Sequence, residues 1–216
     1  MPDIFDEVDE ELRADRLRQF SKKYGGALLG AAVLAVAASG AWQVWQRYEA
    51  KRTAEVAEIF IEGIRAADGA AAGRTEATKR FVAVQEKGGH GYRVLARLRE
   101  AAVKAASGDL AGASALWDQV AADGSADRLL RDGADLQWVM HHIDSGDPAV
   151  VEARLKPLLA RDNPWQALAR EQLALLDLRQ GKTDSARTAL KQLAQDVSAP
   201  EGVRDRASGL LAQLGS

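Results

Sequence analysis

The sequence predicts an all-α protein in which an N-terminal transmembrane helix is followed by a stack of helical repeats. Alanine and leucine are abundant while aromatic residues make up only 6% of the chain, and such side chains lose little freedom in a helix. Residues 24–46 carry no charge, and beyond them glycine interrupts the helical pattern at nearly constant intervals. We therefore expect a cytoplasmic tail over 1–23, a membrane-spanning helix over 24–46 and a repeat domain over 47–216.

The tail has the pattern of a short amphipathic helix. Its apolar residues recur mostly at spacings of three to five, and Asp9 lies four residues before Arg13, a distance at which opposite charges pair on a helix. The apolar residues are Ile4, Phe5, Val8, Leu12, Leu17 and Phe20. Two interpretations stay open: this helix docks on a membrane partner, or it is a solvated extension beside the membrane.

The segment 24–46 is 23 residues long and uncharged, and a helix of about 20 apolar residues spans the roughly 30 Å of bilayer hydrocarbon. Tyr24 lies at one end, and Trp42 and Trp45 lie at the other. Amphipathic rings of this kind favour the level of the lipid headgroups. The segment therefore predicts a single-pass anchor.

Two alternatives compete with an uncleaved anchor. A buried helix of a soluble protein rarely stays uncharged beyond about 10–14 residues. A cleaved signal peptide would use Ala37, Ser39 and Ala41 as its small residues, but the long acidic segment that precedes them is poor for export. The uncleaved anchor is the favoured interpretation, and a soluble periplasmic binding module released by cleavage is the alternative.

Lysine and arginine predict the orientation of the anchor. Five basic residues precede it and three lie among the six residues after it, and the flank richer in these residues stays in the cytoplasm. The residues are Arg13, Arg16, Arg18, Lys22 and Lys23 on the first flank, and Arg47, Lys51 and Arg52 on the second. We expect a cytoplasmic N-terminus and a periplasmic C-terminal domain in a bacterial inner membrane.

Gly26 and Gly30 form a small-xxx-small pair within the predicted anchor. In lipid, small residues let two helices approach closely, so this face is a candidate membrane docking surface. The alternative is that these glycines reflect only the Ala- and Gly-rich composition of the segment.

The repeats are indicated by glycines at 73, 108, 146 and 181, with spacings of 35, 38 and 35 residues. At the same distances from each of the last three glycines stand small or β-branched residues, followed by large ones. These equivalent positions are Ala101, Val139 and Ala174; Ala113, Val151 and Ala186; Trp117, Leu155 and Leu190; and Val120, Leu158 and Leu193. A capping helix is predicted over 200–214, and Pro157 is expected to kink or break its helix.

This pattern resembles the tetratricopeptide repeat. It has a small residue in the first helix, a glycine at the turn, and a small residue followed by a large one in the second helix. The opening DIFDEVDEELRADRLRQFSKKYG, with the glycine-rich apolar segment and the repeats after it, resembles the family of ancillary subunits of the bacterial Sec translocon. That resemblance implies a membrane-anchored scaffold whose periplasmic domain associates with the translocation channel and links it to periplasmic chaperones. A related domain occurs in cell-division coordinators, so an envelope scaffold for division is a further alternative.

The composition argues against several other classes of function. The chain has no cysteine, which excludes disulfides and thiolate chemistry, and its 29 Lys and Arg residues balance 31 Asp and Glu residues, so nucleic acid is not an expected partner. His90, His141 and His142 are the only imidazoles, and the adjacent pair on a helix cannot face one metal ion. We expect a non-enzymatic protein with protein partners, possible self-association, and no cofactor, metal or small-molecule substrate.

A candidate partner groove follows from the inner face of the first helix of each repeat. Eight of nine residues at the equivalent offsets are apolar. The residues are Leu98, Ala102 and Ala105; Leu136, Met140 and Ile143; and Glu171, Leu175 and Leu178. A patch of this size is normally covered. Either the domain covers it, through its last helix or its own curvature, or an apolar helix or unfolded segment of a partner does.

Overall fold

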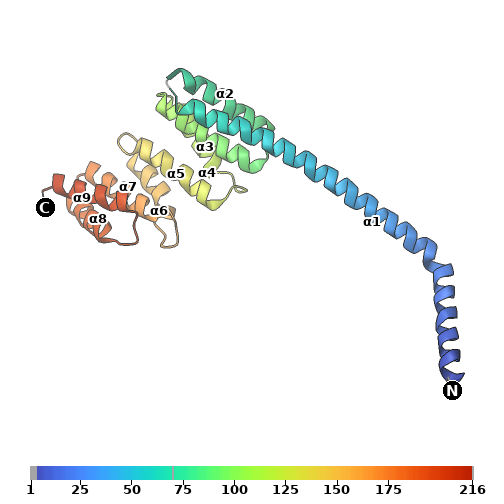
Figure 1. Cartoon of the computed structure of the whole chain (residues 1–216). Helices are drawn as coiled ribbons and strands as arrows, with labels where there is room; N and C mark the ends of the chain where they lie inside the picture. Colours follow the sequence, from blue (N-terminus) through green and yellow to red (C-terminus); the bar gives the residue numbers. More distant parts are fainter. Residues whose placement is uncertain (1–3, 70, 216) are drawn as a thin grey trace. The chain divides into compact units, whose positions relative to one another are not determined.

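The computed structural model describes residues 4–69 and 71–215, and every regular element within these ranges is a helix (Figure 1). The predicted all-α class is confirmed. The chain divides into two compact units, residues 1–54 and residues 55–216. Side chains are described for only part of residues 1–33 and not for 71 and 72.

The first unit contains most of α1, a helix that runs from Ile4 to Ala67. All side chains from residue 34 to residue 54 are exposed. They include large apolar groups, for example Val36 at 73% exposure and Trp42 at 58%. This unit therefore shows an apolar helix surface that no neighbouring side chain of the unit buries.

The predicted transmembrane segment, residues 24–46, lies within α1, but the side chains of residues 24, 25, 27, 28 and 31–33 lie outside the described part of the structure. Among the residues that are described, no helix has both the length and the apolar character needed to cross a membrane. The membrane span therefore has no support from the fold and remains a prediction.

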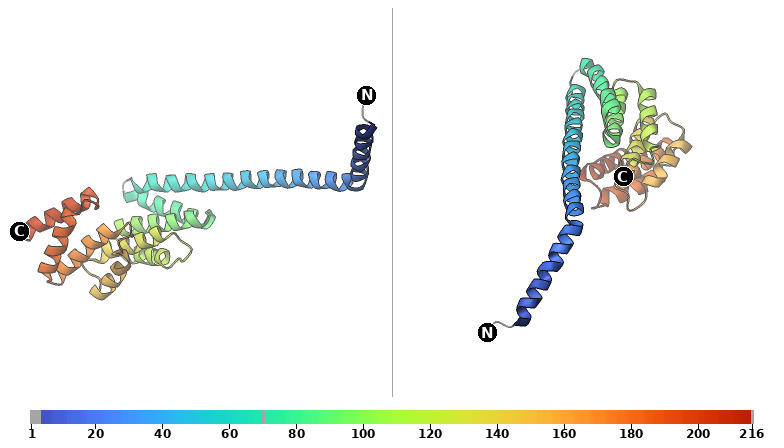
Figure 2. Two further views of the ribbon diagram at one scale, coloured as in Figure 1. Left: turned by 90° about the horizontal axis from the view of Figure 1, so that it is seen from below. Right: turned by 90° about the vertical axis from the view of Figure 1, so that its right-hand side faces the viewer.

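The second unit is a succession of antiparallel helices that follow the C-terminal turns of α1. The helices are α2 (Ala71–Lys87), α3 (His90–Ala106), α4 (Leu110–Ala121), α5 (Arg128–His142), α6 (Pro148–Leu158), α7 (Gln166–Arg179), α8 (Thr183–Gln195) and α9 (Glu201–Gln213). Each packs on the next, and α3, α5, α7 and α9 also contact one another in order. Figure 2 shows this succession from two further directions. Three helical hairpins, α3–α4, α5–α6 and α7–α8, thus stack side by side.

The core of the stack is formed by the equivalent positions of the repeats. All twelve residues at these positions are 1% exposed or less. In each hairpin a small or β-branched residue of the first helix shares a hydrophobic cluster with a large residue of the second: Ala101 with Trp117, Val139 with Leu155, and Ala174 with Leu190. The predicted repeat register therefore agrees with the observed packing.

Two of the repeat glycines end their helices in the same way. Gly108 and Gly181 have positive φ angles of 86° and 74°, which residues with a Cβ rarely adopt. The N–H groups of Asp109 and Lys182 reach back to the carbonyls of Lys104 and Asp177, five residues earlier. This is the Schellman arrangement, which satisfies carbonyls left without partners at the end of a helix.

The prediction that Gly73 marks a turn is wrong. Gly73 lies inside α2, and the chain turns before it, at Asp68 and Gly69. A Cβ at residue 73 would collide with the carbonyl oxygen of Ala66, so this glycine serves close packing of α2 against the end of α1. Gly146 does lie in the turn between α5 and α6, without a positive φ angle.

Helix α6 begins with Pro148 at its first position, and the Asp147 carboxylate accepts a hydrogen bond from the Ala149 N–H at 2.9 Å. Pro157 lies inside the last turn of α6 and has no N–H to donate to the preceding turn. The helix stops one residue later, at Leu158. An irregular connection over residues 159–165 follows, and it carries Trp165.

The end of the stack is covered by α9. Val203 and Ala207 are buried against the core of α8, while Asp205 and Ser208 face solvent. Arg206 donates two hydrogen bonds of 2.6 Å to Glu171 on α7, whose side chain is only 4% exposed. A terminal helix with a polar outer face prevents further stacking.

Trp117 fills the interface between the first two hairpins, so Trp117→Ala should reduce the free energy of unfolding by about 3–5 kcal/mol through lost burial and a cavity. Urea unfolding of the full chain, followed by circular dichroism, measures this loss. Val150→Ala, at a residue 42% exposed, is the control and should change stability by less than about 0.5 kcal/mol. A Trp117→Ala variant as stable as wild type would contradict the repeat packing.

Candidate functional site

An apolar cleft lies between the first helices of two hairpins, α3 and α5. Its volume is about 350 Å³. It is lined by Leu95, Leu98, Arg99 and Ala102 of α3, by Trp117 of α4, by Leu129, Leu130, Gly133 and Gln137 of α5, and by Trp165. Leu95 and Leu129 remain 38% and 43% exposed at the cleft. Apolar lining with few polar groups is the usual composition of a ligand site in a protein.

Trp165 forms one wall of the cleft, and hydrogen bonds hold both its indole ring and its backbone. Its indole N–H donates to the carbonyl of Leu129 at 2.9 Å, and its backbone N–H donates to Asn163 at 2.9 Å. Asn163 is only 5% exposed and donates to Asp132 on α5 at 2.8 Å. The loop after α6 is thereby fixed to α5, and the indole is positioned in advance of any ligand.

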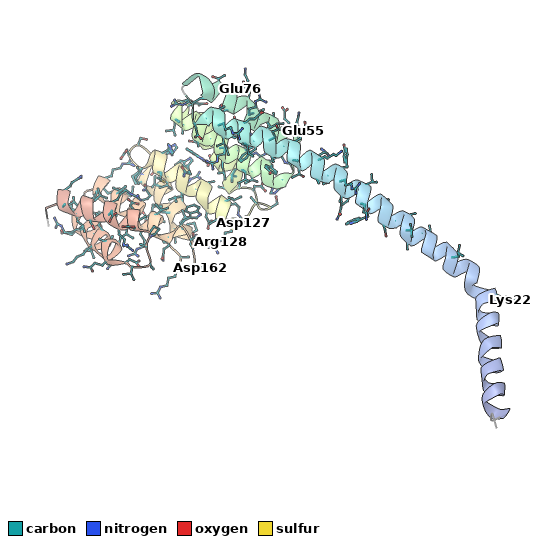
Figure 3. The ribbon with its side chains drawn as sticks, in the orientation of Figure 1. Lys22, Glu55, Glu76, Asp127, Arg128 and Asp162 are labelled. Atoms are coloured by element: carbon teal, nitrogen blue, oxygen red, sulfur yellow. The ribbon has the colours of Figure 1, made fainter. Side chains whose placement is uncertain are left out.

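A surface ion pair adds to this attachment. Arg128 lies 3.4 Å from Asp132 and 3.6 Å from Asp162, and Figure 3 shows Asp127, Arg128 and Asp162 at the same edge of the unit. Asp127 itself caps α5 by accepting the Leu129 N–H at 2.8 Å. Exposed pairs of this kind contribute little energy, so the buried Asn163 is the stronger link.

Gly133 makes room for the indole. A Cβ at this position would lie 3.3 Å from the Cζ2 atom of Trp165, which is tighter than ordinary van der Waals contact. The ring therefore packs directly on the backbone of α5. A side chain at residue 133 would push the tryptophan away from the helix and change the shape of the cleft.

A second, smaller hollow adjoins the first across α3. Its volume is about 210 Å³, and it is lined by Ile64, Ala67, Asp68, Arg74, Phe81, Arg99, Ala102, Val103 and Ala106. Arg99 and Ala102 belong to both hollows. The exposed face of α3 is thus flanked by a hollow on each side, and the smaller one also carries Asp68 and Arg74.

The predicted partner groove is only partly the same surface. Leu98 and Ala102 line the cleft. Leu136 and Ile143 instead belong to the core between α5, α6 and α7, with exposures of 2% and 9%, and Leu175 packs against that core. Met140 is exposed at 42%, while Leu178 is half-buried, and neither lines the cleft. For Leu136 and Ile143, the expectation of a groove-facing side chain is wrong.

The error has a geometric cause. Equal offsets from the turn glycines select the same side of every first helix, but a cleft between two helices is lined by the sides that face each other. On α5 that side carries Leu129, Gly133 and Gln137, at spacings of four, which the offsets miss. The four-residue spacing of this stripe was visible in the sequence, whereas the contribution of Trp165 from a loop was not.

A serine, a histidine and an aspartate meet elsewhere in the unit. The Nε2 atom of His90 lies 2.8 Å from Ser125 Oγ and 3.0 Å from Asp123 Oδ2, and the Ser125 hydroxyl donates to Asp123 Oδ1 at 2.6 Å. In a catalytic triad the serine and the acid contact different nitrogens of the imidazole. Here both contact Nε2, so the cluster links the start of α3 to the loop before α5.

The other candidate residues lie apart from the cleft. Gly26 and Gly30 are exposed in the first unit, and a Cβ at either position would meet no described atom within 4 Å. His141 packs on Trp117 with ring centroids 4.7 Å apart, and His142 stacks on Trp138 at 3.9 Å. Among the residues that the structure describes, no three acids or histidines are grouped to hold a metal ion.

Stacked helical hairpins with a shared core and an apolar cleft between their first helices define an α-helical repeat protein. The tetratricopeptide repeat-like domain family matches residues 18–137 of the chain. Because this match covers more than half of the sequence, the chain belongs to that family, and the predicted tetratricopeptide-like repeats are confirmed. No curated protein and no solved structure shows a significant match to the chain. Domains of this family act typically as protein-interaction scaffolds.

The His90 cluster predicts a dependence of stability on pH. Hydrogen bonds from Ser125 and then from His90 lower the pKa of Asp123 from 3.8 to about 2. A carboxylate whose pKa is lowered by folding stabilises the protein above its unfolded value, and this contribution disappears as pH falls through the folded value. Asp123→Asn should therefore be less stable than wild type at neutral pH, and the difference should shrink between about pH 4 and pH 2.

Urea midpoints of both proteins, measured over this range of pH, test the expectation. Asp144→Asn is a suitable control because Asp144 is exposed and accepts no side-chain hydrogen bond from the described residues. A difference between wild type and Asp123→Asn that stays constant with pH would contradict the assignment.

Proposed function

We propose that this chain is a non-enzymatic scaffold that binds an apolar segment of a partner protein in the cleft between α3 and α5. The observation that carries the proposal is the cleft itself, with Leu95 and Leu129 exposed beside a rigidly held Trp165. Exposed leucines next to a preformed hollow are typical of a site that a partner's apolar side chains fill.

The contrast with the other end of the stack supports this choice. On α7 Glu171, which is equivalent to Leu98 of α3, is buried and paired with Arg206 of α9. That part of the inner face is covered by the domain itself. On α3 Leu98 is only half-buried and the next inner residue, Ala102, is exposed, so the site left for a partner lies there.

Ala102 borders both hollows, so Ala102→Trp should fill the space that a ligand needs. Displayed libraries of random short peptides, selected on the immobilised full chain, should yield enriched apolar sequences with wild type and lose that enrichment with Ala102→Trp. Ala153→Trp, at an exposed position on α6, should keep it. Equal enrichment by the wild-type and Ala102→Trp proteins would exclude the cleft as the binding site.

We further propose that the N-terminal helix anchors the scaffold in a bacterial inner membrane, with the second unit in the periplasm. The support is the uncharged segment 24–46, the exposed apolar side chains of residues 34–48, and the aromatic rings of Trp42, Trp45 and Tyr48 at one end of that segment. The ring centroids of Trp42 and Trp45 lie 5.2 Å apart, and Arg52 lies over Tyr48. An aromatic and basic band of this kind is favoured at a membrane interface.

The resemblance of the tail and anchor to ancillary Sec translocon subunits suggests the partners. In this proposal the anchor associates with the translocation channel, using Gly26 and Gly30 as the small residues of the contact. The cleft of the second unit receives periplasmic chaperones or their clients.

Topology is testable because the chain has no native cysteine. Ser216→Cys and Ser21→Cys each introduce a single thiol. A membrane-impermeant maleimide, added to cells with a permeabilised outer membrane, should label only the first. Labelling of the second alone would show that the orientation is reversed. A measured mass of the purified protein that lacks the N-terminal residues would show that the segment is a cleaved signal peptide and not an anchor.

A further inference from the structure

Arg99 is the only charged residue that lines the cleft between α3 and α5. Its side chain is exposed on α3 and also borders the smaller hollow on the other side of that helix. Arg99 therefore borders two hollows, of about 350 and 210 Å³.

Arg99 also has no polar partner, in contrast to Arg74 and Arg97. Arg74 donates to the carbonyl of Ala106 at 2.8 Å, and Arg97 lies 4.0 Å from Asp123. Arg154, on α6, bridges Asp118 and Asp135 at 2.6 and 2.8 Å. Within the described residues, Arg99 makes neither a hydrogen bond nor an ion pair. Its five N–H donors are available to a ligand.

A ligand that covers the two hollows also removes water from the guanidinium group between them. Losing that hydration without a replacement acceptor costs free energy, because a desolvated charge needs a partner. A carboxylate is the acceptor whose planar geometry matches the guanidinium fork, and such pairs form strong, charge-assisted hydrogen bonds. Asp68, the only acid that borders the smaller hollow, is not within ion-pair distance of Arg99.

We propose that the partner segment carries an acidic residue that pairs with Arg99, flanked by apolar residues that fill the two hollows. This inference rests on the proposed function of the cleft and specifies its ligand: a protein segment with an aspartate or glutamate between apolar side chains. The hollows supply apolar contact area, and Arg99 selects the charge of the residue between them.

The experiment compares displayed random peptides selected by the full-length wild type, Arg99→Glu and Arg99→Gln. Wild type should enrich Asp or Glu between apolar residues. Arg99→Gln should lose the acidic preference, and Arg99→Glu should replace it with Lys or Arg. Arg93→Glu is the matched control, because Arg93 is exposed on the same helix and lines neither hollow. It should select the same peptides as wild type.

A synthetic peptide with the sequence that wild type selects then gives the size of the effect. Its dissociation constant, measured by fluorescence anisotropy, should rise about tenfold or more with Arg99→Glu, as expected for reversing a charge at an interface. Replacing the acid of the peptide by lysine should restore binding to Arg99→Glu. Unfolding followed by circular dichroism should show that the Arg99 and Arg93 variants are as stable as wild type.

The outcomes separate this inference from the proposed function. Apolar sequences that are enriched without any acidic preference would leave the cleft as a binding site and overturn the role of Arg99. Equal enrichment of acids by wild type and Arg99→Glu would do the same. If no sequence is enriched above the Ala102→Trp background, the cleft is not a peptide site, and both proposals fail.

Discussion

The folded stack depends on the fit between a small or β-branched residue in the first helix of each hairpin and a large residue in the second. Trp117, Leu155 and Leu190 are almost fully buried because Ala101, Val139 and Ala174 let the helices approach closely. A single hairpin cannot bury its apolar face alone, so each pair becomes stable only against its neighbours. Without a cysteine in the chain, hydrophobic packing carries the stability that disulfides supply in other small domains.

The same constraint explains why the cleft lies where it does. Packing requires each hairpin to contact the next one, but it does not require the first helices to close over each other along their whole length. Between α7 and α9 the space is closed by the pairing of Glu171 with Arg206. Between α3 and α5 it is bounded instead by Trp165, which comes from the loop that follows α6. A loop residue thus supplies one wall of the candidate site.

Electrostatic contacts serve mainly to orient this packing. Arg154 pairs with Asp118 and Asp135 and lies 4.2 Å above the ring of Trp138, so it connects three helices of two hairpins. Burial raises the pKa of Asp135, although the charge of Arg154 acts in the opposite direction. Arg99 differs because its surroundings in the cleft are apolar, which makes it available for recognition.

The sequence by itself determined the helical class, the repeat register and most of the buried core, because glycine spacing and the alternation of small and large residues are local patterns. It also identified Leu98 and Ala102 of the cleft. It misplaced Gly73, Leu136 and Ile143, because offsets along the chain do not say which sides of two helices face each other. The positions of Trp165 and Arg99 beside the cleft were decided only by the tertiary structure, since both follow from contacts between residues far apart in the chain.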